Sequence, residues 1–268
     1  MKHLKKKRLP LSNAYLWIIL ALMYLPILVI IIYSFNVSKL SNEWTGFSLD
    51  WYRELFSDRS MAEALRNTLV LGFLSSCAAA VLGTLGAVGL PKARLPFKGA
   101  IEYISMLPMM TPEIILGMVS LTFFSLLSLP FGMLTLFLAH TAFCTPYVYM
   151  QVKARLVGLD ASLLEAARDL GAGEARAFFD ITLPLIAPAI VSGMLLAFAM
   201  SIDDVIISVF VTGANTTTLP IKIYTMLKTG VTPKINALCT LMFVVTLLIV
   251  IVASLIGRRK PKLPNTKS

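Results

Sequence analysis

The stretch SLLEAARDLGAGEARAFFDITLP, residues 162–184, is charged and rich in helix-capping signals, yet it lies between two long apolar runs. Ser162 followed three residues later by Glu165 matches a capping box. Gly171 matches the left-handed position at which many helices end. These signals predict a short helix that begins at Ser162 and ends at Leu170, directly before the glycine.

The apolar face of this predicted helix is built partly from small side chains: Leu163, Ala166, Ala167 and Leu170. Such a face lets another backbone approach closely. Glu165 and Asp169 are four residues apart and repel each other in an isolated helix, which Arg168 offsets only in part. An outside basic partner would explain this charge pattern. An ordinary solvated loop with helices lying on the membrane surface would explain it equally well.

The composition of the 268-residue chain is that of an integral membrane protein. Hydrophobic residues make up 57% of the sequence, charged residues 14%, and the mean hydropathy is +0.80, far outside the range of soluble domains. The net charge of +10 does not indicate nucleic-acid binding, because the basic residues cluster beside apolar segments, where insertion bias and anionic lipids explain them. The chain is therefore expected to contact membrane lipid and no nucleic acid. The three cysteines share no metal-like spacing, and no metal site is expected.

Six segments are apolar over the roughly 20 residues that a helix needs to cross a bilayer. They are Tyr15–Phe35, Leu65–Leu90, Ala100–Leu127, Phe131–Met150, Leu185–Val211 and Asn236–Ile256. Six spans place both termini on one side. On that side lie five Lys and Arg in the N-terminal tail, three in the second-to-third loop, four in the fourth-to-fifth loop and five in the C-terminal tail, against seven on the other side. The bias predicts that both termini and the 162–184 stretch are cytoplasmic.

The expected organisation is a basic cytoplasmic tail at 1–13, a six-span membrane domain at 14–257 and a second basic tail at 258–268. The charged cytoplasmic loop is expected over 153–184, with a second short helix near Glu174–Ile181 that ends at the proline of ITLP. Between the first two spans, Trp51, Leu55 and Phe56 are spaced to coat one side of a helix, which is expected to lie along the membrane surface.

The spacing of the charged loop resembles the EAA loop of bacterial ABC importer permeases. All fixed positions of that motif match, namely Glu165, Ala166, Ala167, Gly171, Ile181, Leu183 and Pro184. The resemblance implies the all-α, six-helix fold of type I importer permeases, called MetI-like. It also implies that the first loop helix is a coupling helix, which docks in a cleft of an ATP-binding subunit. The residues expected to make this contact are Ser162, Leu163, Glu165, Ala166, Ala167, Asp169, Leu170 and Gly171.

The chain has no means of hydrolysing ATP by itself. No Gly-Lys pair occurs in the sequence, so a phosphate-binding P-loop is absent. The resemblance accordingly implies no cofactor in this chain, with ATP and Mg²⁺ bound by a partner ATPase. It further implies a homologous second permease subunit, two copies of the ATP-binding subunit, an extracytoplasmic binding protein and a location in the bacterial inner membrane.

Segments along nearly the whole chain resemble a permease subunit of the spermidine/putrescine importers. They include GFSLDWYRELF (46–56), MTPEIILG (110–117), HTAFCTPYV (140–148), SIDDVIISVFVTG (201–213) and LPIKIYTMLKTGVTPKINAL (219–238). The resemblance implies a polyamine cargo delivered by a polyamine-binding protein. The alternatives are a related importer for an opine, an amino-acid derivative or ferric iron, and, in a different class, an ion-coupled secondary transporter or channel.

Three carboxylates, Glu113, Asp203 and Asp204, lie inside predicted spans, where unpaired charges are costly and are functional candidates by default. Fixed acids would lower the barrier to the passage of a flexible multiple cation. Ser201, Asp204 and Ser208 form a polar stripe at helical spacing, so Asp204 is the better pathway candidate. Asp203 is expected instead to cap or hydrogen-bond a neighbouring helix or the partner subunit.

Glu113 has a second explanation, and one histidine also lies inside a predicted span. Pro108 and Pro112 are expected to break the third span, with Thr111 capping a new helix. Glu113 would then lie near that helix's positive end, which stabilises a carboxylate without any ligand, or it would contact a cation. His140, in the fourth span, is expected to form interhelical hydrogen bonds rather than to bind a ligand.

Overall fold

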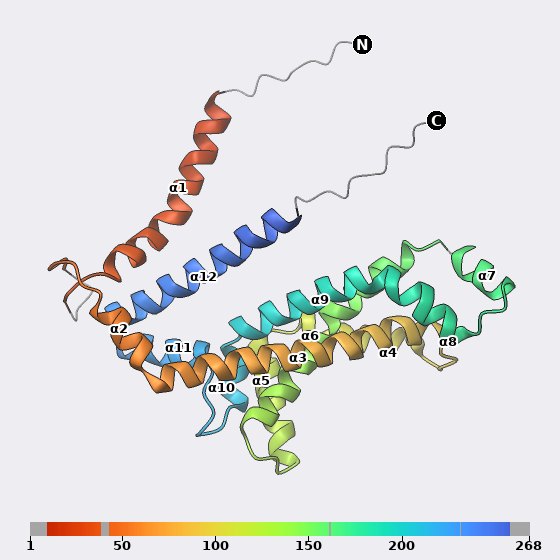
Figure 1. The fold of residues 1–268 in the computed structure, drawn as a ribbon. Helices are drawn as coiled ribbons and strands as arrows, with labels where there is room; N and C mark the ends of the chain where they lie inside the picture. Colours follow the sequence, from red (N-terminus) through yellow and green to blue (C-terminus); the bar gives the residue numbers. More distant parts are fainter. Residues whose placement is uncertain (1–9, 39–42, 161, 231, 258–268) are drawn as a thin grey trace. The chain divides into compact units, whose positions relative to one another are not determined.

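The computed structural model describes residues 10–38, 43–160, 162–230 and 232–257. Residues 1–9 of the first predicted tail and the whole of the second, 258–268, lie outside the described residues. The chain divides into two compact units, one formed by Met1–Arg59 with Thr225–Ser268 and the other by Ser60–Tyr224. Both units are built from helices (Figure 1).

The helices of the first unit are α1 (Pro10–Tyr33), α2 (Asp50–Ser57) and α12 (Pro233–Gly257). α12 contacts both α1 and α2. At the start of α12, the Lys234 ammonium donates to Glu54 Oε1 at 2.8 Å and to Asp58 Oδ2 at 3.0 Å, which ties this end of α12 to α2.

α2 turns part of its predicted apolar side inward, and its position along the membrane surface stays a prediction. Leu55 is buried, and the Trp51 ring nitrogen donates to the Asn36 carbonyl oxygen at 2.8 Å. Tyr52 shares a hydrogen bond of 2.7 Å with Ser34 Oγ. Of the three apolar residues in the pattern, only Phe56 is largely exposed, at 72%. The spacing correctly marked an amphipathic helix, of which Leu55 and Trp51 pack within the unit while Phe56 stays exposed.

The second unit contains the helices from α3 to α10 and the first part of α11. They are α3 (Arg59–Lys92), α4 (Lys98–Met110), α5 (Glu113–Leu126), α6 (Met133–Val157), α7 (Ser162–Asp169), α8 (Glu174–Ala177), a π-helical turn (Phe178–Thr182), α9 (Leu183–Asp203), α10 (Ile206–Val211) and α11 (Leu219–Thr229), which runs across the boundary between the units. α6 packs closely against α9 and α3. A Cβ added at Gly193 of α9 would lie 3.0 Å from Val148 Cα, and one at Gly83 of α3 would lie 2.8 Å from Tyr149 N. Small residues thus let two backbones approach α6, whose polar side chains become buried.

Four helical segments are long and apolar enough to cross a membrane: Ala14–Tyr33, Arg59–Lys92, Met133–Val157 and Glu174–Asp203. α4 and α5 qualify together as a fifth, bent by 111°. In the described part of α12 the apolar helix covers Pro233–Val244. The chain is therefore a multi-pass helical membrane protein, and the count of six spans stays a prediction.

The break in the third span is confirmed, but its cap differs from the prediction. α4 ends at Met110 and contains Pro108, and α5 begins at Glu113 after Pro112. Thr111 Oγ1 donates to the Leu107 carbonyl oxygen at 2.7 Å, so this side chain closes α4 instead of capping α5. Proline lacks the N–H that would continue the α4 ladder, which explains the position of the break.

The helix in the structure differs from the predicted fifth span, Leu185–Val211, at both ends. The loop helix does not end at Pro184, because a π-helical turn joins α8 to α9 and the helix continues through it. A π turn shifts the hydrogen-bond register by one residue, which accommodates the missing N–H of the proline. At the other end the predicted helix is interrupted, since α9 ends at Asp203 and α10 begins at Ile206.

Candidate functional site

The C-terminal end of α7 forms as predicted from Gly171. This glycine has φ +83°, and its N–H donates to the Arg168 carbonyl oxygen at 2.9 Å. The Ala172 N–H donates to the Ala167 carbonyl oxygen at 3.0 Å. The two bonds together are a Schellman motif, which satisfies the last carbonyls of the helix and turns the chain sharply.

The N-terminal end of α7 is capped by Asp160, and the predicted Ser162–Glu165 capping box was wrong. Asp160 Oδ1 accepts the Ser162 N–H at 3.0 Å. This backbone hydrogen bond, with the Ser162 side chain, lowers the pKa of the Asp160 carboxyl below its usual 3.8. Both residue types are good caps, and the one directly after the α6 turn takes the role.

Replacing Asp160 by alanine should therefore weaken the start of α7, whereas Ser162→Ala should have little effect. The amide hydrogens of Ser162 and Leu163 are expected to exchange several-fold faster in the first variant, measured by hydrogen–deuterium exchange at neutral pH. Because the pKa of Asp160 is lowered in the folded chain, its contribution is complete at neutral pH and is lost as the pH falls below about 3.8. Equal exchange rates in the two variants would contradict this assignment.

α7 presents much of its apolar surface to the outside. Leu170 is 90% exposed and Leu163 46% exposed, and Ala166 is exposed beside them. Ala167 is the exception, since it is buried on the side of α7 that meets α8 and the π-helical turn. The predicted single apolar face is thus divided: one alanine anchors the helix, and the rest is open to a partner.

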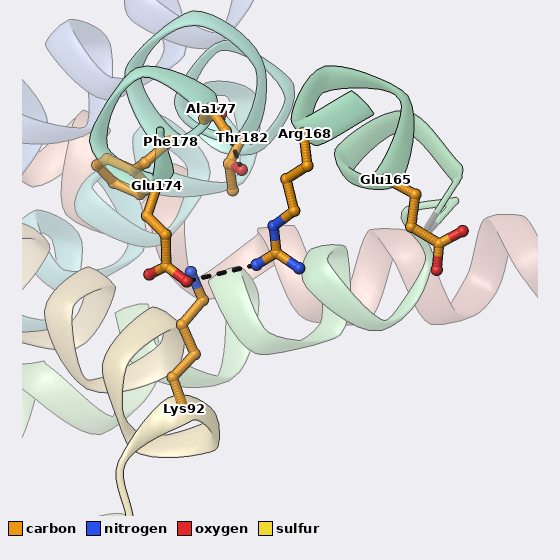
Figure 2. A pocket seen from close by; sticks show the side chains of 7 residues that line it. All are labelled: Lys92, Glu165, Arg168, Glu174, Ala177, Phe178 and Thr182. Carbon is orange, nitrogen blue, oxygen red and sulfur yellow. Dashed lines mark hydrogen bonds and ion pairs between the residues drawn. The ribbon is translucent and has the colours of Figure 1, made fainter. Parts of the chain in front are cut away.

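A cavity of about 170 Å³ lies under α7, between the end of α3 and the start of α8 (Figure 2). Arg168 crosses it and pairs with Glu174 Oε1 at 3.5 Å, and Lys92 points from α3 towards the same carboxylate (Figure 2). Glu165 points away from this ion pair (Figure 2). Because Arg168 is engaged with Glu174, the Glu165 and Asp169 carboxylates, both exposed, remain available to a basic partner.

The end of α6, from which the loop starts, is bonded to two other helices. Lys153, near the end of α6, pairs with Glu102 of α4. Arg155 Nε donates to the Leu185 carbonyl oxygen of α9 at 3.1 Å. These bonds hold α6 to α4 and α9, while α7 itself contacts α8 and the π-helical turn that leads into α9.

The three predicted pathway carboxylates converge on one cavity of about 250 Å³. It is lined by Glu113, Phe143, Ala199, Met200, Asp203 and Asp204. Glu113 starts α5 immediately after the helix break, and Asp203 ends α9; both are exposed. Asp204 is buried in the gap between α9 and α10. The cavity can therefore offer carboxylate oxygens to a cation from two broken spans.

Asp204 performs the capping that the sequence analysis expected of Asp203. Its carboxylate accepts the backbone N–H groups of Ile207 at 3.2 Å and of Ser208 at 2.8 Å. The Ser208 hydroxyl also donates to Asp204 Oδ2 at 2.7 Å. These bonds satisfy the first donors of α10 within an apolar segment, which allows the helix to break there.

His140 is the centre of this polar cluster, and its predicted interhelical hydrogen bonds are confirmed. Its Nδ1 lies 2.7 Å from Ser201 Oγ, and its Nε2 lies 3.0 Å from Ser208 Oγ and 3.4 Å from Asp204 Oδ2. The ring is fully buried. Ser201 and Ser208, predicted as pathway residues, are themselves buried around His140.

Sequence reasoning missed Ser75 and Phe143. Ser75 of α3 lies 3.1 Å from Ser201 Oγ, and the Phe143 ring contacts the His140 ring edge-on, with centroids 5.2 Å apart. A signal for Phe143 was available, since it lies three residues after His140 and shares its side of a helix. Ser75 comes from a distant segment and had no local signal.

The fold and the two sites define a class: a helical membrane permease with an exposed short helix on one loop and a carboxylate-lined cavity between broken spans. The chain belongs to the family described as the binding-protein-dependent transport system inner membrane component, whose model matches residues 79–259. Two relatives are similar over most of their length. The spermidine/putrescine transport system permease protein PotC of Haemophilus influenzae is 39% identical over 249 residues, which are 93% of this chain and 97% of the relative. The putrescine transport system permease protein PotI of Escherichia coli is 42% identical over 248 residues, 90% of this chain and 88% of the relative.

Two solved structures share the fold. The chain matches a bacterial ABC transporter involved in the import of the acidic polysaccharide alginate with a TM-score of 0.69 and 15% identity, covering 94% of this chain and 95% of the other. It matches an amino acid ABC transporter with a TM-score of 0.59 and 20% identity, covering 80% of this chain and 100% of the other. The fold is accordingly the MetI-like fold of ABC importer permeases. In general terms, a permease of such an importer works with a partner permease, an ATPase and a substrate-binding protein.

Proposed function

We propose that the chain is the transmembrane permease subunit of an ATP-driven importer of polyamines such as spermidine and putrescine. The observation that carries this proposal is its similarity, at 39% and 42% identity over nearly the whole chain, to permeases named for these cargoes. The chemistry of the cavity supports it, because its charged side chains, Glu113, Asp203 and Asp204, are all acidic. A carboxylate-lined cavity suits a cargo that carries several positive charges.

The proposed assembly contains a homologous second permease, a dimer of ATP-binding subunits and an extracytoplasmic polyamine-binding protein. This chain would supply half of the translocation path, and the ATPase subunits would bind ATP and Mg²⁺. The Lys and Arg bias supports an orientation in the bacterial inner membrane with both termini and the 153–184 loop in the cytoplasm.

In this proposal α7 is the coupling helix. Its exposed Leu163, Ala166 and Leu170 would enter a cleft of the ATPase, and Glu165 and Asp169 would face basic residues at the rim. ATP would close the ATPase dimer, move α7 and open the spans outward to receive the cargo from the binding protein. Hydrolysis would then return the path to its inward-open state. The contacts of α7 with α8 and the π-helical turn, which leads into α9, would carry the movement to the cavity at the far end of α9.

The test is ATP hydrolysis by the purified complex in lipid, with the binding protein either empty or loaded with spermidine or putrescine. Stimulation several-fold above the empty protein by a loaded form is expected. ATPase activity that ignores polyamines would keep the importer but discard the cargo, in favour of an opine, an amino-acid derivative or ferric iron. Transport by this chain alone, driven by an ion gradient, would instead indicate a secondary transporter or channel.

A further inference from the structure

The short helix α10 is held in place at both of its ends. At its start, Asp204 accepts the backbone N–H groups of Ile207 and Ser208. At its end, Thr135 Oγ1 of α6 lies 2.8 Å from the Val211 carbonyl oxygen, and both of these residues are buried. α10 is therefore a fixed surface against which another helix can pack.

α5 needs such a surface, because the helix that precedes it does not set its direction. α4 and α5 are separated at Thr111 and Pro112 and bent by 111°, so no continuous hydrogen-bond ladder fixes one relative to the other. α5 packs instead against α10, and Figure 1 shows the two helices side by side. The contact with α10 therefore decides where Glu113, the first residue of α5, lies.

The contact between α5 and α10 depends on the absence of a side chain at Gly117. Gly117 and Phe124 are the buried residues of α5, and Glu113 lies one turn before Gly117 on the same side of the helix. A Cβ added at Gly117 would overlap Cδ2 of Phe210 of α10 and would lie 3.1 Å from both its Cγ and its Cε2. The edge of the Phe210 ring thus occupies the space that a larger residue at position 117 would need.

We propose that Gly117 and Phe210 are positioning residues of the cargo path: the Phe210 ring, seated on Gly117, holds α5 against α10 and thereby holds Glu113 at the same cavity as Asp203. Asp203 ends α9, directly before the junction that leads to α10, so the packing of α5 on α10 fixes the separation of the two carboxylates. The role in transport rests on the proposed function. The seating of α5 on α10 rests on the packing alone.

Gly117→Leu should lower polyamine uptake about tenfold, because the added side chain pushes α5 away from α10 and moves Glu113 away from Asp203. Uptake is measured in cells and divided by the amount of assembled complex. Ser125→Leu is the matched control, since it adds a leucine to the same helix at an exposed position, and it should keep normal uptake.

The compensating double variant Gly117→Leu/Phe210→Val tests whether the two residues act as a pair. It exchanges the ring for a smaller side chain and keeps the total number of side-chain carbons, and packed interiors tolerate such volume-conserving exchanges best. It should recover most of the lost uptake. If Gly117→Leu alone does not assemble, assembly of the double variant supplies the same comparison. A double variant that neither assembles nor transports better than Gly117→Leu would overturn the pairing.

The same substitution in a Glu113→Gln chain separates positioning from general damage. If Gly117 acts through Glu113, Gly117→Leu adds little once the carboxylate is gone, and the combined loss stays at about tenfold. A merely structural role for Gly117 would make the two losses independent, so that they multiply to about a hundredfold. That result would overturn the positioning role.

Hydrogen–deuterium exchange of α5 in the lipid-reconstituted complex tests the seating without any cargo. The α5 amides are expected to exchange several-fold faster in Gly117→Leu than in the native chain or the compensating double variant. Unchanged exchange and unchanged uptake in Gly117→Leu, in a complex stimulated by polyamines, would refute this inference and keep the proposed function. Faster exchange that the double variant reverses, in a complex whose ATPase ignores polyamines, would refute the proposed cargo and keep the seating of α5.

Discussion

Gly171→Val is expected to lower cargo uptake about tenfold while the chain still inserts in the membrane. Gly171 has φ +83°, a conformation that costs other residues roughly 1–2 kcal/mol and a β-branched residue at least that. A free-energy change of about 1.4 kcal/mol alters an equilibrium tenfold. The strain would undo the Schellman motif, and α7, with most of its apolar surface exposed, has few other contacts to hold its end. Uptake and co-purification of the ATPase subunit measure the loss.

Gly173→Val is the matched control. A Cβ at either glycine would meet no atom within 4 Å, so the two substitutions add the same bulk to open space. Gly173 has φ −66°, which valine adopts without strain. Gly171→Asn should retain much of the activity, because asparagine tolerates the left-handed conformation. Normal uptake with normal co-purification of the ATPase in Gly171→Val would refute the role of this turn.

Local signals predicted the end of α7 better than its start. A positive φ at Gly171 depends on the residue and its immediate neighbours, so the sequence was sufficient. The start offered two competent caps, Asp160 and Ser162, two residues apart. The choice depends on where α6 ends, and α6 continues to Val157, past the predicted Met150. The end of α6 depends on its tertiary packing, which the sequence pattern does not predict.

The interruption at Asp203 and Asp204 shows how a polar stripe can mislead. Ser201, Asp204 and Ser208 were interpreted as one side of a continuous helix, which made Asp204 the pathway residue and Asp203 the cap. In the structure the helix breaks, and the same three residues gather around His140 because Asp204 caps α10. A capping signal was present, since aspartate is a preferred N-cap. It was outweighed by the apolar run on both sides, which favours an unbroken span.

The sequence predicted a common role for Glu113, Asp203 and Asp204, but it did not predict that they lie at one cavity. The sequence identified all three because acids inside apolar runs are costly. Their meeting at one cavity depends on α5 packing against α10, a contact between segments far apart in the chain. Both helices begin beside an interruption, and each interruption exposes backbone that a single straight span would hide. The broken spans therefore allow the acids to reach the same cavity.

The double variant Glu113→Gln/Asp203→Asn is expected to lower polyamine uptake about a hundredfold, with each single variant lowering it about tenfold. A hydrogen bond to a charged group contributes roughly 1.5–3 kcal/mol, and each amide removes the charge while keeping the size of the side chain. The two carboxylates are exposed at the cavity, so neither substitution leaves a buried group unpaired. Uptake of spermidine and putrescine by cells, with the amount of assembled complex measured in parallel, gives the effect.

Asp203→Glu and Glu113→Asp are the matched controls, because they keep the charge and should keep most of the uptake. Stimulation of ATP hydrolysis by the loaded binding protein should persist in the double variant, since α7 and its contacts are untouched. Unchanged uptake in the double variant would remove these two residues from the path. If Asp204→Asn alone matched the hundredfold loss while Glu113→Gln and Asp203→Asn had no effect, Asp204 would be the residue that contacts the cargo.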